Sequence, residues 1–173
     1  PYTESFRSLR TSLKYVAETS PKVLLVTSSG PSEGKTTIAA NLAEVFAKAG
    51  ERVLLIDADL RKPRIHAIFD FPRTPGVTDS EEGKFGAFIG ESSVEGLSIL
   101  TCGTNIGNPS EFLHLWGKHI VDCVKDRFVR IIIDSPPVNA VADPAILAKV
   151  VDGVLFVVSA GTATKEGVTM ALE

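Results

Sequence analysis

The residues best suited to chemistry form one glycine-containing loop between a short apolar run and a helical pattern. The loop reads Ser28-Ser29-Gly30-Pro31-Ser32-Glu33-Gly34-Lys35-Thr36-Thr37. Such a loop turns backbone N–H groups and a helix N-terminus toward an anion, so it suits a phosphate. We expect Lys35 to contact the β and γ phosphates of a nucleotide and Thr36 to coordinate the bridging Mg²⁺. The expected cofactor-binding residues are Gly30, Pro31, Ser32, Glu33, Gly34, Lys35, Thr36 and Thr37.

The loop is a variant of the usual pattern, which places a glycine five residues before the Gly-Lys pair. This chain has Ser29 at that position, and its nearest glycine is Gly30. A glycine-rich turn before a helix is therefore the alternative interpretation of the loop alone, and the flanking strand and helix patterns make it less favourable.

Two other apolar runs end in carboxylates. Leu54-Leu55-Ile56 precedes Asp57 and Asp59, which would lie on the same side of the pleat if the strand continued and could share a metal ion or a proton. Ile131-Ile132-Ile133 precedes Asp134, the position from which P-loop NTPases hold Mg²⁺. One such Asp is often only a turn former, but three carboxylates beside a phosphate loop favour a bound cation because they would otherwise repel one another.

The elements that must position these residues alternate along the chain. Buried-strand patterns cover 23–27, 53–56, 97–100, 129–133 and 154–158, and helical patterns cover 35–49, 111–127 and 143–150. Apolar strands alternating with helices predict an α/β fold with a mainly parallel sheet covered by helices on both faces. Ligands of such sheets bind beyond the carboxyl ends of the strands, where each motif above begins. The segment 71–95 is predicted to be a surface excursion.

Composition limits the class of protein. With 173 residues, 44% hydrophobic and 23% charged, we expect a single domain over 1–173. A net charge of −3 gives no basic field for nucleic acid. Neither the cysteines nor the histidines have the spacing of a disulfide framework or a metal site, and a reducing cytosol fits best. We see no signal peptide or membrane-spanning run, and we expect the chain to be a piece of a longer protein.

Three motifs together make the sequence resemble the bacterial tyrosine kinases, an exopolysaccharide-associated family with a deviant P-loop ATPase fold. They are the loop 30–36, the apolar run followed by Asp57-Ala58-Asp59-Leu60-Arg61, and the apolar run followed by Asp134-Ser135-Pro136-Pro137. The second motif is the most diagnostic. Weaker similarity extends over nearly the whole chain and includes Arg61-Lys62-Pro63, Thr74-Pro75-Gly76, Asn108-Pro109-Ser110-Glu111 and Asp143-Pro144.

The resemblance implies transfer of the ATP γ-phosphoryl group to protein tyrosines. By similarity, Asp57 is a candidate base or a residue that hydrogen-bonds to a ligand of the metal, and Asp59 is a metal or acceptor-positioning residue. Asp134 and Thr36 would serve Mg²⁺, and Arg61 begins a basic cluster able to attract an acidic acceptor or offset transition-state charge. The expected catalytic set is Lys35, Asp57, Asp59, Arg61 and Asp134, with Thr36, Asp59 and Asp134 at the metal.

The N-terminal segment 1–20 carries a further family feature. Glu4, Arg7 and Arg10 resemble an ExxRxxR element that packs subunits into a ring, which predicts a homo-oligomer. An apolar helical stripe lies beside them and consists of Phe6, Leu9, Leu13 and Val16. A solvated surface helix with intrahelical ion pairs is the alternative. The resemblance also implies a membrane activator of polysaccharide export and a cytoplasmic location at the inner face of the membrane.

Two other functions remain open from sequence. A partition or division-site ATPase of the same fold usually carries a lysine four residues before the last loop glycine, where this chain has Gly30. A non-catalytic nucleotide-binding regulator of polysaccharide export is the second alternative. It is kept because the chain has only Tyr2 and Tyr15 and no tyrosine-rich tail.

Overall fold

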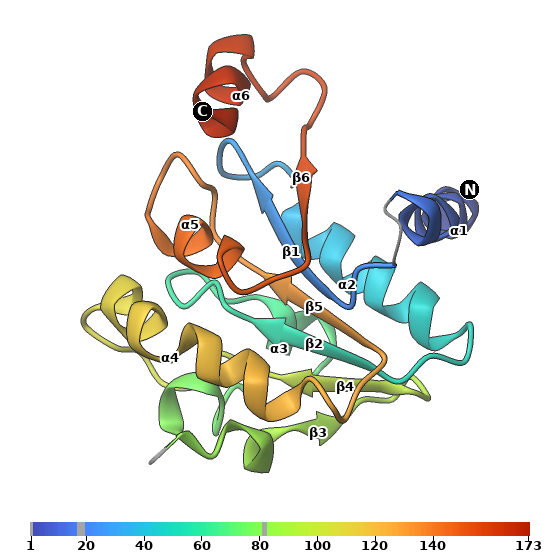
Figure 1. The fold of residues 1–173 in the computed structure, drawn as a ribbon, viewed down its shortest axis with the longest axis vertical. Helices are drawn as coiled ribbons and strands as arrows, with labels where there is room; N and C mark the ends of the chain where they lie inside the picture. The colour runs from blue at the N-terminus through green and yellow to red at the C-terminus, as the bar shows by residue number, and fades with distance from the viewer. Residues whose placement is uncertain (1, 17–19, 81–82) are drawn as a thin grey trace.

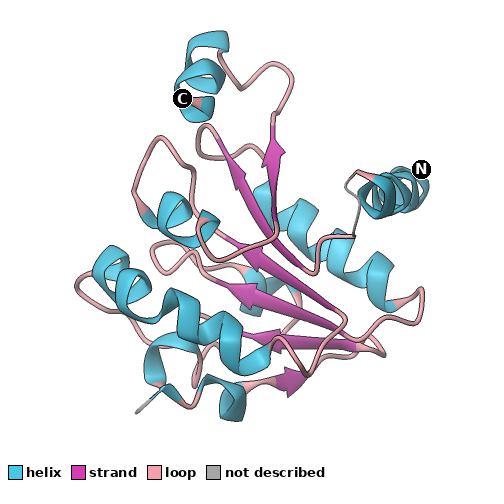
Figure 2. Ribbon diagram, viewed as in Figure 1, coloured by secondary structure: helices cyan, strands magenta, loops and turns pink. Residues whose placement is uncertain are grey.

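The computed structural model describes residues 2–16, 20–80 and 83–173, and they form one sheet flanked by helices (Figures 1 and 2). The strands are β1 (Val23–Ser28), β2 (Val53–Asp57), β3 (Gly90–Glu91), β4 (Leu97–Leu100), β5 (Arg130–Asp134) and β6 (Gly153–Val157). The α-helices are α1 (Tyr2–Tyr15), α2 (Lys35–Ala47), α3 (Ile65–Ile68), α4 (Pro109–Val124), α5 (Asp143–Ala148) and α6 (Lys165–Leu172). Two 3₁₀ turns are η1 (Val77–Asp79) and η3 (Phe85–Phe88).

The six strands lie in the order β3-β4-β2-β5-β1-β6. All neighbouring pairs are parallel except β3 with β4, which is antiparallel. The predicted α/β fold with a mainly parallel sheet is therefore confirmed. The carboxyl ends of β1, β2 and β5 meet at one edge, and the three sequence motifs follow these three ends.

Alternation along the central strands divides the core between the two faces of the sheet. Leu25, Ile56 and Ile133 pack with residues of α4 and α5, whereas Val26, Leu55 and Ile132 pack with α2. The long strands are buried on both faces, which explains why they read as continuous apolar runs rather than alternating ones. Figure 1 shows α4 and α5 on one side of the sheet and α2 on the other.

The prediction of a surface excursion over 71–95 is wrong for part of that segment. Val77 in η1 and Phe85 in η3 are fully buried in the core that includes α4, and Trp116 packs edge-on against Phe85 at 5.8 Å between ring centroids. The short strand β3, which sequence analysis missed, extends the sheet. The few buried apolar residues are separated by glycine and polar residues, so they leave no periodicity to detect.

Helix α1 packs on α2 through its apolar stripe, but the stripe is shorter than predicted. Leu13 is buried and Phe6 and Leu9 are partly buried against the α2 side of the core. Val16 lies beyond the end of α1 and is 72% exposed, so it is not part of the packed stripe. Within residues 2–16, 20–80 and 83–173, no helix combines the length and apolar character needed to cross a membrane.

Candidate nucleotide-binding and catalytic site

The loop between β1 and α2 has the backbone shape of a phosphate loop. Gly34 immediately precedes α2 with φ 85°, a left-handed conformation that favours glycine. Ser32 also has a positive φ of 61°, which is uncommon for a residue with a side chain. Helix α2 then begins at Lys35, whose side chain is buried, and Thr36 follows in its first turn. The helix N-terminus therefore faces the loop, as anion binding requires.

Glu33, which is predicted to bind the cofactor as part of the loop, has a carboxylate that is engaged within the protein. Its carboxylate is buried and accepts hydrogen bonds from Ser29 Oγ at 2.6 Å, Gly30 N at 2.5 Å and Ser159 N at 3.1 Å. Burial raises the pKa of Glu33, but these hydrogen bonds outweigh it and the net pKa lies below the ordinary value. Glu33 thus braces the loop and ties it to the end of β6, and its oxygens are already engaged.

The sheet register places two of the predicted carboxylates side by side. Asp57 at the end of β2 is paired with Asp134 at the end of β5, and Ala58 N donates to the Asp134 carbonyl at 2.9 Å. Side chains two residues apart on a strand point to the same face of the sheet. Asp57 and Asp134 therefore share the face of Leu55 and Ile132, which is covered by α2. That face is where Lys35 and Thr36 open α2, so the register explains why these residues come together.

Burial makes the two carboxylates hard to ionise without a cation. Both are fully buried, and burial raises the pKa of Asp57 to about 7, with a further contribution from the charge of Asp59. Burial and the charge of Asp57 raise the pKa of Asp134 to about 8, while the nearby Thr36 hydroxyl acts in the opposite direction. Carboxylates with pKa values raised this far are typical of functional sites.

The segment after β2 wraps around its own carboxylates. Asp57 Oδ2 accepts hydrogen bonds from Arg64 N at 3.1 Å and Ile65 N at 3.0 Å. Asp59 Oδ1 accepts one from Lys62 N at 2.9 Å. Strand β2 ends at Asp57, so the strand pleat does not determine the position of Asp59. The turn closed by Lys62 N determines it instead. We call residues 58–64 the carboxylate loop.

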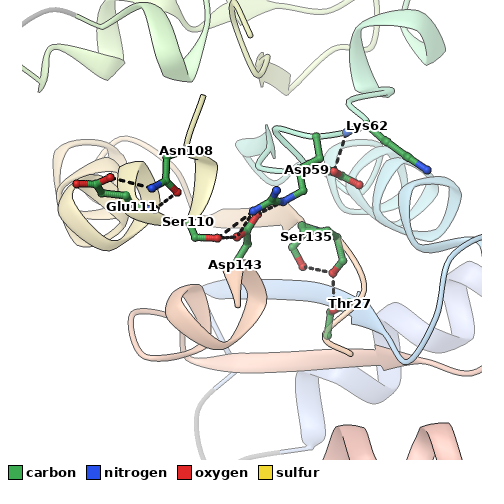
Figure 3. Close-up of polar contacts among 10 residues, drawn as sticks. Thr27, Asp59, Lys62, Asn108, Ser110, Glu111, Ser135 and Asp143 are labelled. Carbon is green, nitrogen blue, oxygen red and sulfur yellow. Dashed lines mark hydrogen bonds and ion pairs between the residues drawn. The ribbon is translucent and has the colours of Figure 1, made fainter. Parts of the chain in front are cut away.

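Arg61 in the carboxylate loop is engaged with residues of α4 and α5. Its Nε donates to Asp143 Oδ2 at 3.1 Å, and its Nη2 donates to Asp143 Oδ1 at 3.3 Å and to Ser110 Oγ at 2.9 Å. Ser110 Oγ in turn donates to Asp143 Oδ1. Figure 3 shows Asp143 and Ser110 facing one another from α5 and α4. The structure therefore brings Arg61 into an ion pair rather than into the nucleotide cavity.

A cavity of about 740 Å³ lies between the two loops. One wall comes from the phosphate loop and the start of α2, and the other comes from Asp59, the basic residues that follow it and α3. The lining residues are Pro31, Ser32, Gly34, Lys35, Thr36, Thr37, Asp59, Lys62, Pro63, Arg64, His66, Ala67, Ile68 and Pro137. This volume is sufficient for a cofactor-sized ligand.

The carboxylates at the strand ends fit a divalent cation that takes its remaining ligands from phosphate and water. Asp57 Oδ1 and both side-chain oxygens of Asp134 are buried without a hydrogen-bond partner in the protein. Buried oxygens of this kind carry a free-energy cost unless a cation or donor satisfies them. In the part of the chain that the structure describes, no group of three or more Asp, Glu, His or Cys side chains forms a ready-made metal site. Mg²⁺ commonly needs only one or two carboxylates and takes its other ligands from phosphate and water.

Sequence reasoning missed the residues that hold the two loops in place. Asp143 and Ser110 appeared only as parts of short family-like motifs, and Ser159 had no signal at all. Asp143 is fully buried, which its position before a proline did not indicate because Asp-Pro is typical of exposed helix starts. Such partners lie 49 to 126 residues from the residues they contact in the loops, so local patterns could not reveal them.

The fold and the site define a P-loop nucleotide-binding protein. Residues 24–83 match the CobQ/CobB/MinD/ParA nucleotide binding domain. The septum site-determining protein MinD of Pyrococcus horikoshii, solved with Mg-ADP, superposes with a TM-score of 0.64 at 18% identity, over 79% of this chain and 57% of that one. At this identity the similarity shows the fold alone.

Other relatives are much more similar. The tyrosine-protein kinase YwqD of Bacillus subtilis is 39% identical over 99% of this chain and 74% of its own length. The kinase domain of the Escherichia coli tyrosine kinase ETK superposes with a TM-score of 0.90 at 32% identity, over 98% of this chain and 68% of that one. The chimerical protein CapA2B2 gives a TM-score of 0.92 at 32% identity, over 99% of this chain and 77% of that one. The chain belongs to the bacterial tyrosine-protein kinases of the P-loop type.

Proposed function

We propose that this protein transfers the γ-phosphoryl group of Mg·ATP to tyrosine hydroxyls of proteins, in a system for capsule or exopolysaccharide synthesis and export. The observation that carries the chemistry is that the phosphate loop, Asp57 and Asp134 follow neighbouring parallel strand ends at one edge of the sheet. Membership of the tyrosine-kinase family supports the choice of acceptor. The partition-type ATPases share only the fold, and Gly30 stands where they usually carry a lysine.

The donor half of the reaction belongs to α2 and the strand ends. Phosphoryl transfer depends mainly on positioning and on neutralising charge. Lys35 would bind the β and γ phosphates, and the loop N–H groups would hold them. Thr36, Asp59 and Asp134 would hold Mg²⁺, which when bound neutralises phosphate charge and fixes the oxygens for in-line transfer.

The acceptor half belongs to Asp57, Asp59 and the outer cavity wall. Asp57 Oδ1 has no protein partner, and a pKa near 7 suits a group that takes a proton from the tyrosine hydroxyl. Asp59 lines the cavity and would orient the acceptor. Lys62 and Arg64 are exposed on the same wall and would attract acidic residues around the acceptor tyrosine.

The function is tested with the full-length protein, Mg·ATP and phosphotyrosine mapping by mass spectrometry. Wild type is expected to gain phosphotyrosine, and Lys35→Met is expected to abolish the gain because the phosphates lose their buried counter-charge. Lys48→Met is the matched control, since Lys48 lies just beyond the other end of α2 and pairs with the partly exposed Glu44. ATP turnover without phosphotyrosine on any protein would instead indicate a switch ATPase, and ATP binding without turnover a regulator.

Assembly is a separate part of the proposal. Glu4 and Arg7 form an exposed ion pair at 3.4 Å on α1, whereas Arg10 reaches the Val45 carbonyl of α2 at 3.4 Å. We expect Glu4 and Arg7 to contact a neighbouring copy in a ring, and Arg10 to fix the helix that presents them. The ring would work at the inner face of the membrane beside a transmembrane activator.

Solution mass tests the ring. Arg7→Ala is expected to lower the mass of the assembly, whereas Lys118→Ala, which removes a comparable exposed ion pair on α4, is expected to leave it unchanged. Equal masses for wild type and Arg7→Ala would reject this interface.

A further inference from the structure

A polar cluster around one buried carboxylate lies outside the nucleotide cavity and has no role in the mechanism above. It consists of Arg61, Ser110 and Asp143, and we call it the anchor (Figure 3). We propose that Asp143 and Ser110 hold Arg61, and through it the carboxylate loop, in the position that phosphoryl transfer requires. The inference rests on the proposed function for the reaction itself. It makes Arg61 a positioning residue, not a group that contacts an acidic acceptor or offsets charge in the transition state.

The hydrogen bonds of the anchor fix the orientation of the Arg61 guanidinium. Two guanidinium nitrogens reach the two oxygens of Asp143, and one of them also reaches Ser110. Such a two-point contact between Arg and a carboxylate fixes orientation as well as distance. A lysine would supply the charge but only a point contact.

The burial of Asp143 shows that the ion pair is needed in this position. Its side chain is 0% exposed, whereas that of Arg61 is 37% exposed. A buried carboxylate is costly unless it is paired and fully hydrogen-bonded, and both of its oxygens are engaged by Arg61 or Ser110. The N-terminus of α4, where Ser110 lies, is itself capped by Asn108, which accepts from Glu111 N.

The anchor lies on two helices that are packed into the core. Helices α4 and α5 pack together, and Leu113 and Leu147 from these helices are buried in the same core. A loop bonded to this pair of helices takes its position from them. Leu60 of the carboxylate loop is buried in that core too, but an apolar contact has no direction. Arg61 supplies the directional contact beside Leu60.

The contacts inside the carboxylate loop explain why its orientation matters. Backbone amides of Lys62, Arg64 and Ile65 bond to Asp59 and Asp57, so a movement of the loop also moves or releases these carboxylates. A displacement of about 1 Å at a catalytic group costs on the order of a hundredfold in rate. The phosphate loop is braced elsewhere, through Glu33 and Ser159. Loss of the anchor is therefore expected to affect turnover and to spare ATP binding.

The test combines kinetics with hydrogen exchange on the full-length protein. Asp143→Asn and Arg61→Met are each expected to lower kcat by about 10- to 100-fold with KM for ATP unchanged. The double variant is expected to be no worse than either single one, because both act through one contact. Where Arg61→Met does not fold because it leaves a lone buried charge, the double variant removes both charges and keeps the comparison. Arg61→Lys is expected to recover part of the loss.

Amide hydrogen exchange reports whether the carboxylate loop stays in position, and the measurement does not depend on kinase activity. Amide exchange over 58–65 is expected to be faster in the anchor variants, with no change over 30–37. Val121→Ala, an apolar truncation in the same core, is the control: it is expected to lower Tm but to change neither kcat nor exchange over 58–65.

Three results would overturn the anchor. They are unchanged exchange over 58–65 in Asp143→Asn, a raised KM for the acceptor with unchanged kcat in Arg61→Met, and a double variant much worse than Asp143→Asn. The last two would mean that Arg61 contacts the substrates. If wild type makes no phosphotyrosine, the proposed function fails, and the exchange experiment still decides the anchor.

Discussion

Replacing Asp134 by Asn is expected to make the protein more stable and inactive at the same time. Asp134 is fully buried, and neither side-chain oxygen has a hydrogen-bond partner within the protein. Its raised pKa means that folding has to protonate it or bury its charge next to Asp57. A residue that costs stability and persists at a site is expected to serve function.

The size and sign of the effect follow from the pKa. A pKa raised from 3.8 to about 8 corresponds to at most roughly 6 kcal/mol, because each pH unit is worth about 1.4 kcal/mol. The cost of Asp134 is absent below the unfolded pKa, grows as the pH rises, and is complete above about pH 8. The new amide loses about 1–3 kcal/mol unless Asp57 Oδ1 accepts from it. We therefore expect a net gain of at most about 3–5 kcal/mol near pH 8 that shrinks toward pH 4.

Urea unfolding of nucleotide-free protein in EDTA, at several values between pH 4 and 9, measures this gain. The matched control is Asp122→Asn, because Asp122 is exposed and its pKa is lowered to about 2 by Lys118 and Lys125. The stability that Asp122 contributes is present above its unfolded pKa and lost as the pH falls, so its pH dependence has the opposite sign. Mg·ATP is expected to stabilise wild type more than Asp134→Asn. If Asp134→Asn is less stable than wild type near pH 8, the reasoning from burial is wrong.

Three further changes test the parts around the site. Glu33→Gln is expected to weaken ATP binding about tenfold in calorimetric titration, since a charged acceptor of three hydrogen bonds is lost; unchanged affinity would contradict the brace. Gly34→Ala is expected to cost about 1–2 kcal/mol in urea unfolding because of its positive φ, whereas Gly107→Ala, with no positive φ and open space at its Cβ, serves as control. Arg130→Met is expected to lower the free energy of unfolding by roughly 3–5 kcal/mol, because Arg130 is buried, pairs with Glu51 and lies 4.4 Å from the Phe46 ring centroid. Adding Glu51→Gln should recover part of this loss, and full additivity of the two changes would reject the pair.

Much of the fold could be predicted because the central strands are buried on both faces. Apolar runs such as 131–133 allow little besides an interior strand, and the glycine and proline residues that follow them locate the strand ends. The segment 71–95 could not be predicted in the same way. Its buried residues, Val77 and Phe85, stand alone between polar residues, and their burial depends on α4, which lies later in the chain.

The residues of the site also fall into a group that could be predicted from the sequence and a group that could not. The residues that meet phosphate or metal follow strand ends, and parallel strands bring their ends to one edge, so Lys35, Thr36, Asp57 and Asp134 could be predicted together. Their roles stay predictions. The residues that hold the loops depend on tertiary contacts over long sequence separations. Glu33 was predicted to bind the cofactor because it lies in the motif, although its carboxylate faces the loop's own N–H groups.

The two walls of the cavity are held by different parts of the protein, and this has a kinetic consequence. Glu33 ties the phosphate loop to the end of β6, and Arg61 ties the carboxylate loop to α4 and α5. No residue is shared between these two contacts. A change in one is therefore expected to leave the other wall in place, so that Glu33→Gln raises KM for ATP and Asp143→Asn lowers kcat. The free-energy effects of the two changes should then add in the double variant, because additivity is what independent supports require.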